Sequence, residues 1–122
     1  MVPAPKEFSF TKDERLLKRV EFLYVTGDGK KFLTRSFIVF VKPNSLAFSR
    51  IGITASRKVG GAVKRNRVKR LVREFFRLNK TRIKKGIDIV VIAKREAVGK
   101  GFAEVSRELE KVLVPGLQVS IR

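Results

Sequence analysis

The residues of this sequence best suited to chemistry are its arginines and lysines, and they are densest between Arg57 and Lys85. That segment carries thirteen Lys or Arg against a single acid, so it supplies +12 of the chain's net charge of +18. Guanidinium and ammonium groups bind phosphate through charge-assisted hydrogen bonds. A solvated charged face is the ordinary interpretation of a basic helix, but such faces usually carry balancing acids. The imbalance here favours a polyanionic partner.

The sequence lacks the residues that metal binding and enzymatic catalysis usually require. The 122 residues contain no His and no Cys, which removes Cys/His metal sites and His-activated nucleophiles. The eleven carboxylates show no paired set typical of a hydrolase, so we predict no catalytic residue, no metal ligand and no cofactor bound by the chain itself. The charge alone fits nucleic acid or an anionic membrane surface, but no apolar run approaches about 18 residues and the N-terminus does not resemble a signal peptide. The absence of Cys suits a cytoplasmic protein, and we expect no membrane partner.

The basic segment must be held by a helix. Steps of about 100° per residue place an apolar stripe on one side, and the cations on the other. Gly60 and Gly61 precede this helix, so phosphate can approach the N–H groups of its first turn. The predicted stripe consists of Val68, Leu71, Val72, Phe75, Phe76 and Leu78.

The remaining pattern predicts an α+β two-layer sandwich with the helices on one side of a small mixed sheet. A first helix is expected from Thr11 or Asp13 to about Thr26, strands over 35–42, 46–56 and 87–93 with a possible short extra one, and a last helix over 102–113. A crossover between parallel strands is normally right-handed. We predict one domain over 1–122, with an extended lead-in at 1–11 and a tail at 114–122. The first helix is expected to bury Leu16, Leu17, Val20, Leu23 and Tyr24.

Two sets of side chains fall outside the expected core. Phe22 lies off the buried arc of the first helix, beside Arg15 and Lys18, where the pattern fits either a satellite packing residue or a platform for a ligand. Strand alternation places Phe40, Thr54 and Ser56 on a sheet face of mixed aromatic and hydroxyl character. That face suits contact with an extended single strand, and an ordinary half-exposed sheet fits the pattern equally well.

The segment from Gly52 to Phe76, GITASRKVGGAVKRNRVKRLVREFF, resembles the protein subunit of bacterial ribonuclease P. The similarity rests on the Arg-Asn-Arg core at 65–67, on Arg70 and Arg73, and on the apolar strand that follows Lys85-Gly86. It extends over about residues 12–113.

The resemblance implies a fold like domain 2 of ribosomal protein S5, with a left-handed β-α-β crossover. It also implies a separate catalytic RNA that holds Mg²⁺, with which the protein forms a 1:1 complex. The protein would bind that RNA through the basic helix and hold the 5′ leader of precursor tRNA on its sheet. The assembly would cut one phosphodiester to release the leader.

Site residues follow from the resemblance and the helix pattern together. The family commonly has a second aromatic residue four positions after the first, but this chain has Thr26 there. Stacking on the leader would therefore be weaker, or Tyr24 would supply it. For catalytic-RNA binding we predict Lys64, Arg65, Asn66, Arg67, Lys69, Arg70, Arg73 and Arg77. For binding of the precursor-tRNA leader we predict Phe22, Phe40, Thr54, Ser56, Arg57 and Lys58.

Three other classes share part of this pattern. A ribosomal or general RNA-binding protein would have the same charge but no role in cleavage. A DNA-compacting protein would prefer duplex DNA and leave the mixed sheet face unused. A protein-only nuclease would need catalytic residues that this composition does not provide.

Overall fold

The computed structural model describes residues 10–114 and contains one four-stranded sheet, two short 3₁₀ turns and three α-helices. Most of the predicted lead-in and the tail after Val114 lie outside the described residues. In chain order the elements are η2 Lys12–Glu14, α1 Arg19–Asp28, β1 Lys30–Leu33, β2 Phe37–Pro43, β3 Arg50–Ala55, α2 Ala62–Asn79, β4 Ile87–Ala93, η3 Arg95–Ala97 and α3 Phe102–Leu113.

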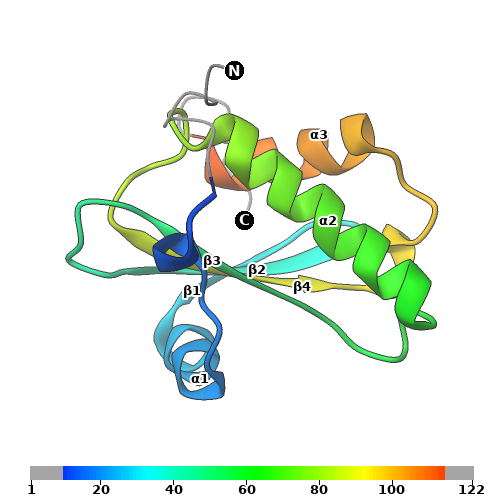
Figure 1. Cartoon of the computed structure of the whole chain (residues 1–122), viewed down its shortest axis with the longest axis horizontal. Coiled ribbons are helices and arrows are strands. Elements are labelled where there is room, and N and C mark those ends of the chain that lie inside the picture. The colour runs from blue at the N-terminus through cyan, green and yellow to red at the C-terminus, as the bar shows by residue number, and fades with distance from the viewer. Residues whose placement is uncertain (1–9, 115–122) are drawn as a thin grey trace, which may run out of the picture.

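The sheet has the order β1-β2-β4-β3, with β3 and β4 parallel and the other neighbours antiparallel. The α+β class with a small mixed sheet is therefore confirmed, and β1 is the short extra strand. The helices do not all lie on one side. Figure 1 shows α2 and α3 above the sheet and α1 below it, so that part of the prediction was wrong.

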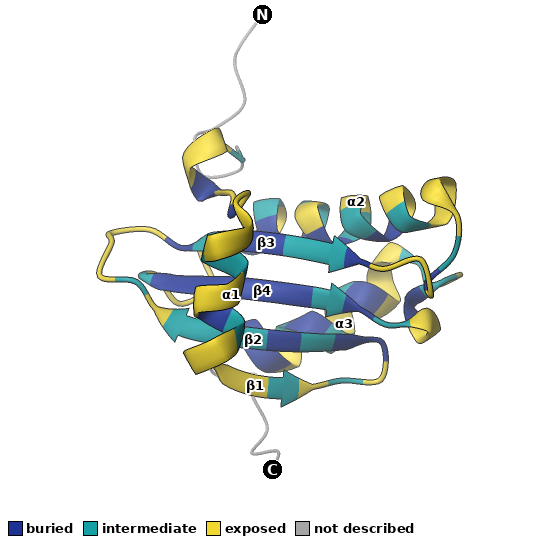
Figure 2. Cartoon of the chain, turned by 90° about the horizontal axis from the view of Figure 1, so that it is seen from below, coloured by how far each residue is buried: buried dark blue, intermediate teal, exposed yellow. Residues whose placement is uncertain are grey.

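The β3-α2-β4 crossover is left-handed, as the family resemblance implied and against the general rule. In Figure 2 the arrows of β3 and β4 point to the right, β3 lies above β4, and α2 runs behind the sheet along β3. A right-handed connection with that helix position would place β4 on the other side of β3.

The main core lies between the sheet and the layer of α2 and α3. Strand alternation sends Phe37 and Val39 of β2, Ile51 of β3 and Ile89 and Val91 of β4 into it, all at most 2% exposed. The predicted face assignment of Phe37 and Val39 against Phe40 is confirmed.

Helix α2 forms where the periodicity predicted it. Its apolar stripe is buried at Val68, Val72, Phe75 and Phe76, as expected for an amphipathic helix on a core. The assignment of Leu78 was wrong, because that side chain is 39% exposed. In the last turn of α2 the next residue along the chain is buried in place of Leu78.

That neighbour is Asn79, which is buried although it is polar. Its amide nitrogen donates to the Phe75 carbonyl at 2.9 Å, and its amide oxygen accepts from the Arg82 guanidinium at 2.9 Å, so the buried polar side chain is hydrogen-bonded within the protein. Periodicity alone cannot detect such a contact.

The first predicted helix is two elements. The Thr11 N–H donates to the Glu14 carboxylate at 2.9 Å, which closes the short turn η2. An extended link follows, and α1 begins only at Arg19, where Glu21 accepts the N–H groups of Leu17 and Lys18 at 3.1 Å. Acidic side chains at a helix start stabilise it, so Glu21 fixes the later beginning of the helix.

The later start of α1 changes which residues of the predicted first helix are buried. Leu16 is 2% exposed and Val25 is 1% exposed, whereas the rest of the predicted arc is open to solvent. The exposed members are Leu17 at 62%, Val20 at 67%, Leu23 at 55% and Tyr24 at 61%.

Candidate RNA-binding surfaces

The outer side of α2 forms a cationic surface, which we call the arginine face. Its members are mainly exposed, and Arg65, Lys69 and Arg77 are half-buried. All eight predicted catalytic-RNA-binding residues lie on this one helix. The arginine face consists of Lys64, Arg65, Asn66, Arg67, Lys69, Arg70, Arg73 and Arg77.

One member of the arginine face is neutralised locally. Arg77 donates to both carboxylate oxygens of Glu74, at 3.1 and 2.6 Å. This hydrogen bonding holds the pKa of Glu74 below its ordinary value, so the carboxylate stays charged. Arg77 is therefore less available to phosphate than Arg70 or Arg73, which the sequence pattern did not distinguish.

Several acids elsewhere in the described part of the chain are engaged by other cations. Lys80 binds Glu14 at 2.8 Å, and Lys42 binds Asp28 at 2.6 Å. Between Arg57 and Lys85 the only acid is Glu74, so the charge of the arginine face is little offset within its own segment. A surface of this kind attracts polyanions.

On the opposite side of the sheet, α1 covers one row of side chains. The row runs across three strands through Gly52, Val90 and Phe40, which face one another in the register. Phe22 rests on this row: a Cβ at Gly52 would lie 2.5 Å from its ring, so only glycine permits the contact. Phe22, Phe40 and Val90 pack in one small cluster with Val25.

The next row across the sheet lies beside α1 and is not covered by a helix, as Figure 2 shows at the right-hand half of the sheet. We call it the open row: Thr54 of β3, Ile92 of β4, Ile38 of β2 and Leu33 of β1, which are paired in that order. The first three are half-buried and Leu33 is 61% exposed. An apolar floor together with a hydroxyl group suits contact with an extended single strand of nucleic acid whose bases are unstacked.

Cations stand at the β3 end of the open row. Ser56, Arg57 and Lys58 follow β3 directly and are exposed, and the Lys58 N–H donates to the Ser56 hydroxyl at 3.2 Å. The six predicted leader-binding residues thus lie around one surface. Phe22 and Phe40 form its edge under α1, Thr54 lies on the open row, and the other three lie at its end.

Tyr24 does not lie on the side of α1 that carries Phe22 and Thr26. Tyr24 lies on the far side of α1 from Phe22, where the Lys42 ammonium is 4.6 Å from its ring centroid. Thr26, one turn after Phe22, donates weakly to the Leu23 carbonyl at 3.5 Å. The surface beside the open row therefore has one aromatic from α1.

A buried ion pair on the α1 side was not predicted. Asp88, 3% exposed, accepts two hydrogen bonds from Arg50 at 2.8 and 2.7 Å and a third from the Asn44 amide at 2.8 Å. Glu21 of α1 lies 3.5 Å from the same guanidinium. The lone acid within the apolar run IDIVVIA is the one sequence signal that could have identified this network.

Two features of residues 10–114 bear on the class of site. No group of three or more His, Cys, Asp or Glu side chains is placed to hold a metal ion there. Nor does that part of the chain contain a helix of the length and hydropathy needed to span a membrane.

Comparisons with known proteins agree with the sequence resemblance. The sequence model of the family described as Ribonuclease P matches residues 10–115. The ribonuclease P protein component of Syntrophus aciditrophicus is 47% identical over 108 residues, which is 88% of this chain and 91% of that protein.

Solved structures show the same relationship. The ribonuclease P protein of Thermotoga maritima superposes with a TM-score of 0.76 at 40% identity, covering 82% of this chain and 94% of that one. A mutant ribonuclease P protein of Staphylococcus aureus superposes with a TM-score of 0.77 at 34% identity, covering 83% and 86%.

Proposed function

Because this chain belongs to the ribonuclease P protein family, and so acts as a protein subunit in the maturation of tRNA 5′ ends, we propose how its two surfaces divide the work. The arginine face binds the RNA subunit. The open row, with the residues around it, binds the single-stranded 5′ leader of precursor tRNA. The observation that carries this proposal is that the two surfaces lie on opposite sides of one sheet.

The arginine face supports RNA binding through charge and geometry. Arginine forms bidentate hydrogen bonds with phosphate and stacks on exposed bases. Exposed Arg67, Arg70 and Arg73 recur at three-residue spacing on a helix whose other side is fixed in the core, so they are presented from a rigid support. Rigid presentation reduces the entropy lost on binding.

The open row gives a reason for selectivity between substrate and product. A leader strand can place bases against Phe22 and the apolar floor while Arg57 and Lys58 contact its phosphates. Mature tRNA has no leader, so it forfeits these contacts. Binding energy from the leader therefore favours the precursor.

In this proposal the catalyst is the RNA subunit with its Mg²⁺ ions, in a 1:1 complex with the protein in the cytoplasm. The protein supplies position and charge neutralisation between two large RNAs. It holds no metal and contributes no catalytic group. This division fits a chain without His or Cys.

The deciding experiment is reconstitution of cleavage at low Mg²⁺ from precursor tRNA and the RNA subunit, with and without this chain. We expect the chain to raise turnover and precursor affinity. Unchanged turnover would contradict the proposal and favour a general RNA-binding protein.

Variants then separate the two surfaces. Arg70→Ala should weaken binding of the RNA subunit and lower the slope of log affinity against log salt by about one unit. Arg19→Ala, an exposed arginine on α1, is the control and should leave that slope unchanged. Phe22→Ala should lower affinity for precursor but not for mature tRNA, and equal losses for both would exclude a leader site here.

A further inference from the structure

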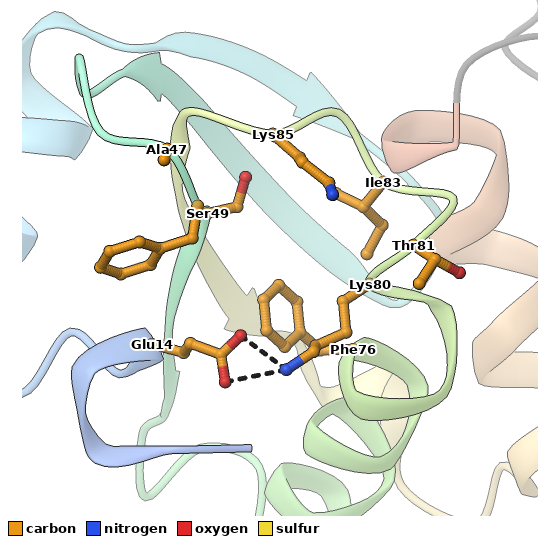
Figure 3. A pocket seen from close by; sticks show the side chains of 9 residues that line it. Glu14, Ala47, Ser49, Phe76, Lys80, Thr81, Ile83 and Lys85 are labelled. Carbon is orange, nitrogen blue, oxygen red and sulfur yellow. Dashed lines mark hydrogen bonds and ion pairs between the residues drawn. The ribbon is translucent and has the colours of Figure 1, made fainter. Parts of the chain in front are cut away.

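A pocket of about 180 Å³ lies where the C-terminal end of α2 meets the loop before β3, away from both surfaces described above. Figure 3 shows its lining: Phe76 from α2, Ser49 and Ala47 from the loop, and Lys80, Ile83 and Lys85 from the segment after the helix. This volume is below the 300–1,000 Å³ typical of sites for drug-sized ligands. It is suited to one planar ring.

The lining has an apolar part and a polar edge. Phe76 and Ile83 are buried, and Phe48 is 38% exposed at the pocket. The polar edge is the Glu14–Lys80 pair, in which the ammonium lies 3.0 and 2.8 Å from the two carboxylate oxygens, as drawn in Figure 3. A ring with hydrogen-bonding groups on one edge matches this combination.

The charge beside the pocket selects a ligand that carries phosphate. Residues 80–85 hold four cations and no acid. Lys84 and Lys85 are exposed, and neither has an ion-pair partner among residues 10–114. The Ser49 hydroxyl donates to the Lys84 carbonyl at 2.6 Å, which fixes this segment against the loop. The cations are thus held at the pocket.

The pocket lies apart from the proposed leader surface. The leader surface lies at the C-terminal end of β3, around Thr54 and Ser56, whereas Phe48 and Ser49 precede the strand. Six strand residues separate the two, a distance of about 20 Å. The pocket instead continues the helix that carries the arginine face, so an RNA bound along α2 reaches it.

We propose that this pocket takes the base of one unpaired nucleotide of the RNA subunit, with the adjacent phosphates on Lys84 and Lys85. The inference rests on the proposed binding of that RNA along α2. Phe48 provides the exposed aromatic surface on which the base stacks, and the Glu14–Lys80 pair meets its polar edge.

The first test measures binding of the RNA subunit by variants of the full chain. Phe48→Ala should weaken binding about tenfold, the effect of losing one base–aromatic stack. Phe102→Ala is a matched control, since Phe102 is 36% exposed on α3 and lines no part of this pocket. Thermal unfolding of both variants verifies that they fold. Equal affinities of the Phe48→Ala variant and the unmodified chain would overturn the proposal.

The second test does not depend on a loss of affinity. A photoreactive benzoylphenylalanine in place of Ala47, at the rim, should crosslink in the assembled complex to one short unpaired stretch of the RNA. Absence of an RNA crosslink, or crosslinks spread over helical regions, would overturn the proposal. If the unmodified chain failed to bind the RNA subunit at all, the proposed function itself would fail, which is a different result.

Discussion

Helices α1 and α2 pack on opposite faces of the same sheet and bury their residues in contrasting ways. Helix α2 buries four large apolar side chains and turns its cations outward. Helix α1 has one buried residue, Val25, and leaves Val20, Leu23 and Tyr24 more than half exposed. One helix completes a core, and the other rests across a sheet that stays partly open.

The difference indicates where each helix performs its function. Since the inner side of α2 is fixed in the core, its outer side is a rigid surface for binding. Helix α1 covers the row of Gly52, Val90 and Phe40 and contacts Arg50 and Lys42 on one side of it, whereas the surface on its other side remains accessible. The functional part of α1 is therefore its side next to the open row, at Phe22.

The largest effect should come from the α2 core. Phe75→Ala removes a ring that is 0% exposed, and we expect a loss of about 3–5 kcal/mol in the free energy of unfolding because a cavity remains. Urea unfolding measures it. Leu23→Ala on α1 is the counterpart and should change stability by less than about 0.5 kcal/mol, because that side chain is exposed. Similar losses for both would contradict the contrast.

The contact between α1 and the sheet should give the next effect. Gly52→Ala places a methyl group against the Phe22 ring, and we expect a loss of about 1–3 kcal/mol from overpacking. Adding Phe22→Ala should recover part of that loss, because the ring that collides is gone.

A double-mutant cycle in urea makes this recovery quantitative. Some strain should remain even then, since Leu16 Cβ lies 3.0 Å from the added methyl group. Additive losses would show that Phe22 does not rest on Gly52.

The sequence predicted α2 better than α1 for a physical reason. The alternation of apolar and charged residues in α2 is strong, so one side alone can be buried. In α1 the segment RVEFLYVTGD is apolar nearly all round, and its packing is decided by the sheet below rather than by its own pattern. The contact of Phe22 with Gly52 joins residues 30 positions apart, so no local pattern contains it, whereas the hydrogen bonds to Glu21 that begin the helix are local.

The site residues divide in the same way. The eight residues of the arginine face could be predicted because they share one helix. Phe40 and Thr54 could be placed by strand alternation, but alternation fails at Phe48, which lies before β3 begins and lines the pocket at the end of α2. The network of Asp88 with Arg50 joins residues 38 positions apart and needed the fold.

A smaller, pH-dependent effect should arise where the layer of α2 and α3 is tied to the sheet. Glu108 of α3 accepts hydrogen bonds from the Ser36 N–H at 2.8 Å and its hydroxyl at 2.7 Å. Burial raises the pKa of Glu108, but hydrogen bonds from Ser36 and Thr34 together with the Lys100 charge outweigh it, and the net pKa is lowered.

A carboxyl group whose pKa is lowered by folding stabilises the protein above its unfolded pKa, and this contribution is lost as pH falls through the folded value. Glu108→Gln should therefore cost about 1–2 kcal/mol at about pH 6 and progressively less toward about pH 3.5. Ser36→Ala, which removes one donor, should show a weaker dependence on pH. A constant difference between the Glu108→Gln variant and the unmodified chain across this range would contradict the assignment.

The smallest effect is expected at Tyr24, and it tests which side of α1 is functional. Tyr24→Ala removes an exposed ring that contacts the Lys42 ammonium, so stability should change by less than about 0.5 kcal/mol. Because Tyr24 lies across the helix from Phe22, precursor affinity should also stay within about twofold, whereas Phe22→Ala lowers it. Thr26→Phe, one turn after Phe22, should strengthen precursor binding, since stacking on an added ring contributes about 1–3 kcal/mol per base. A larger loss from Tyr24→Ala than from Phe22→Ala would place the leader on the other side of α1 and reverse the roles assigned to its two sides.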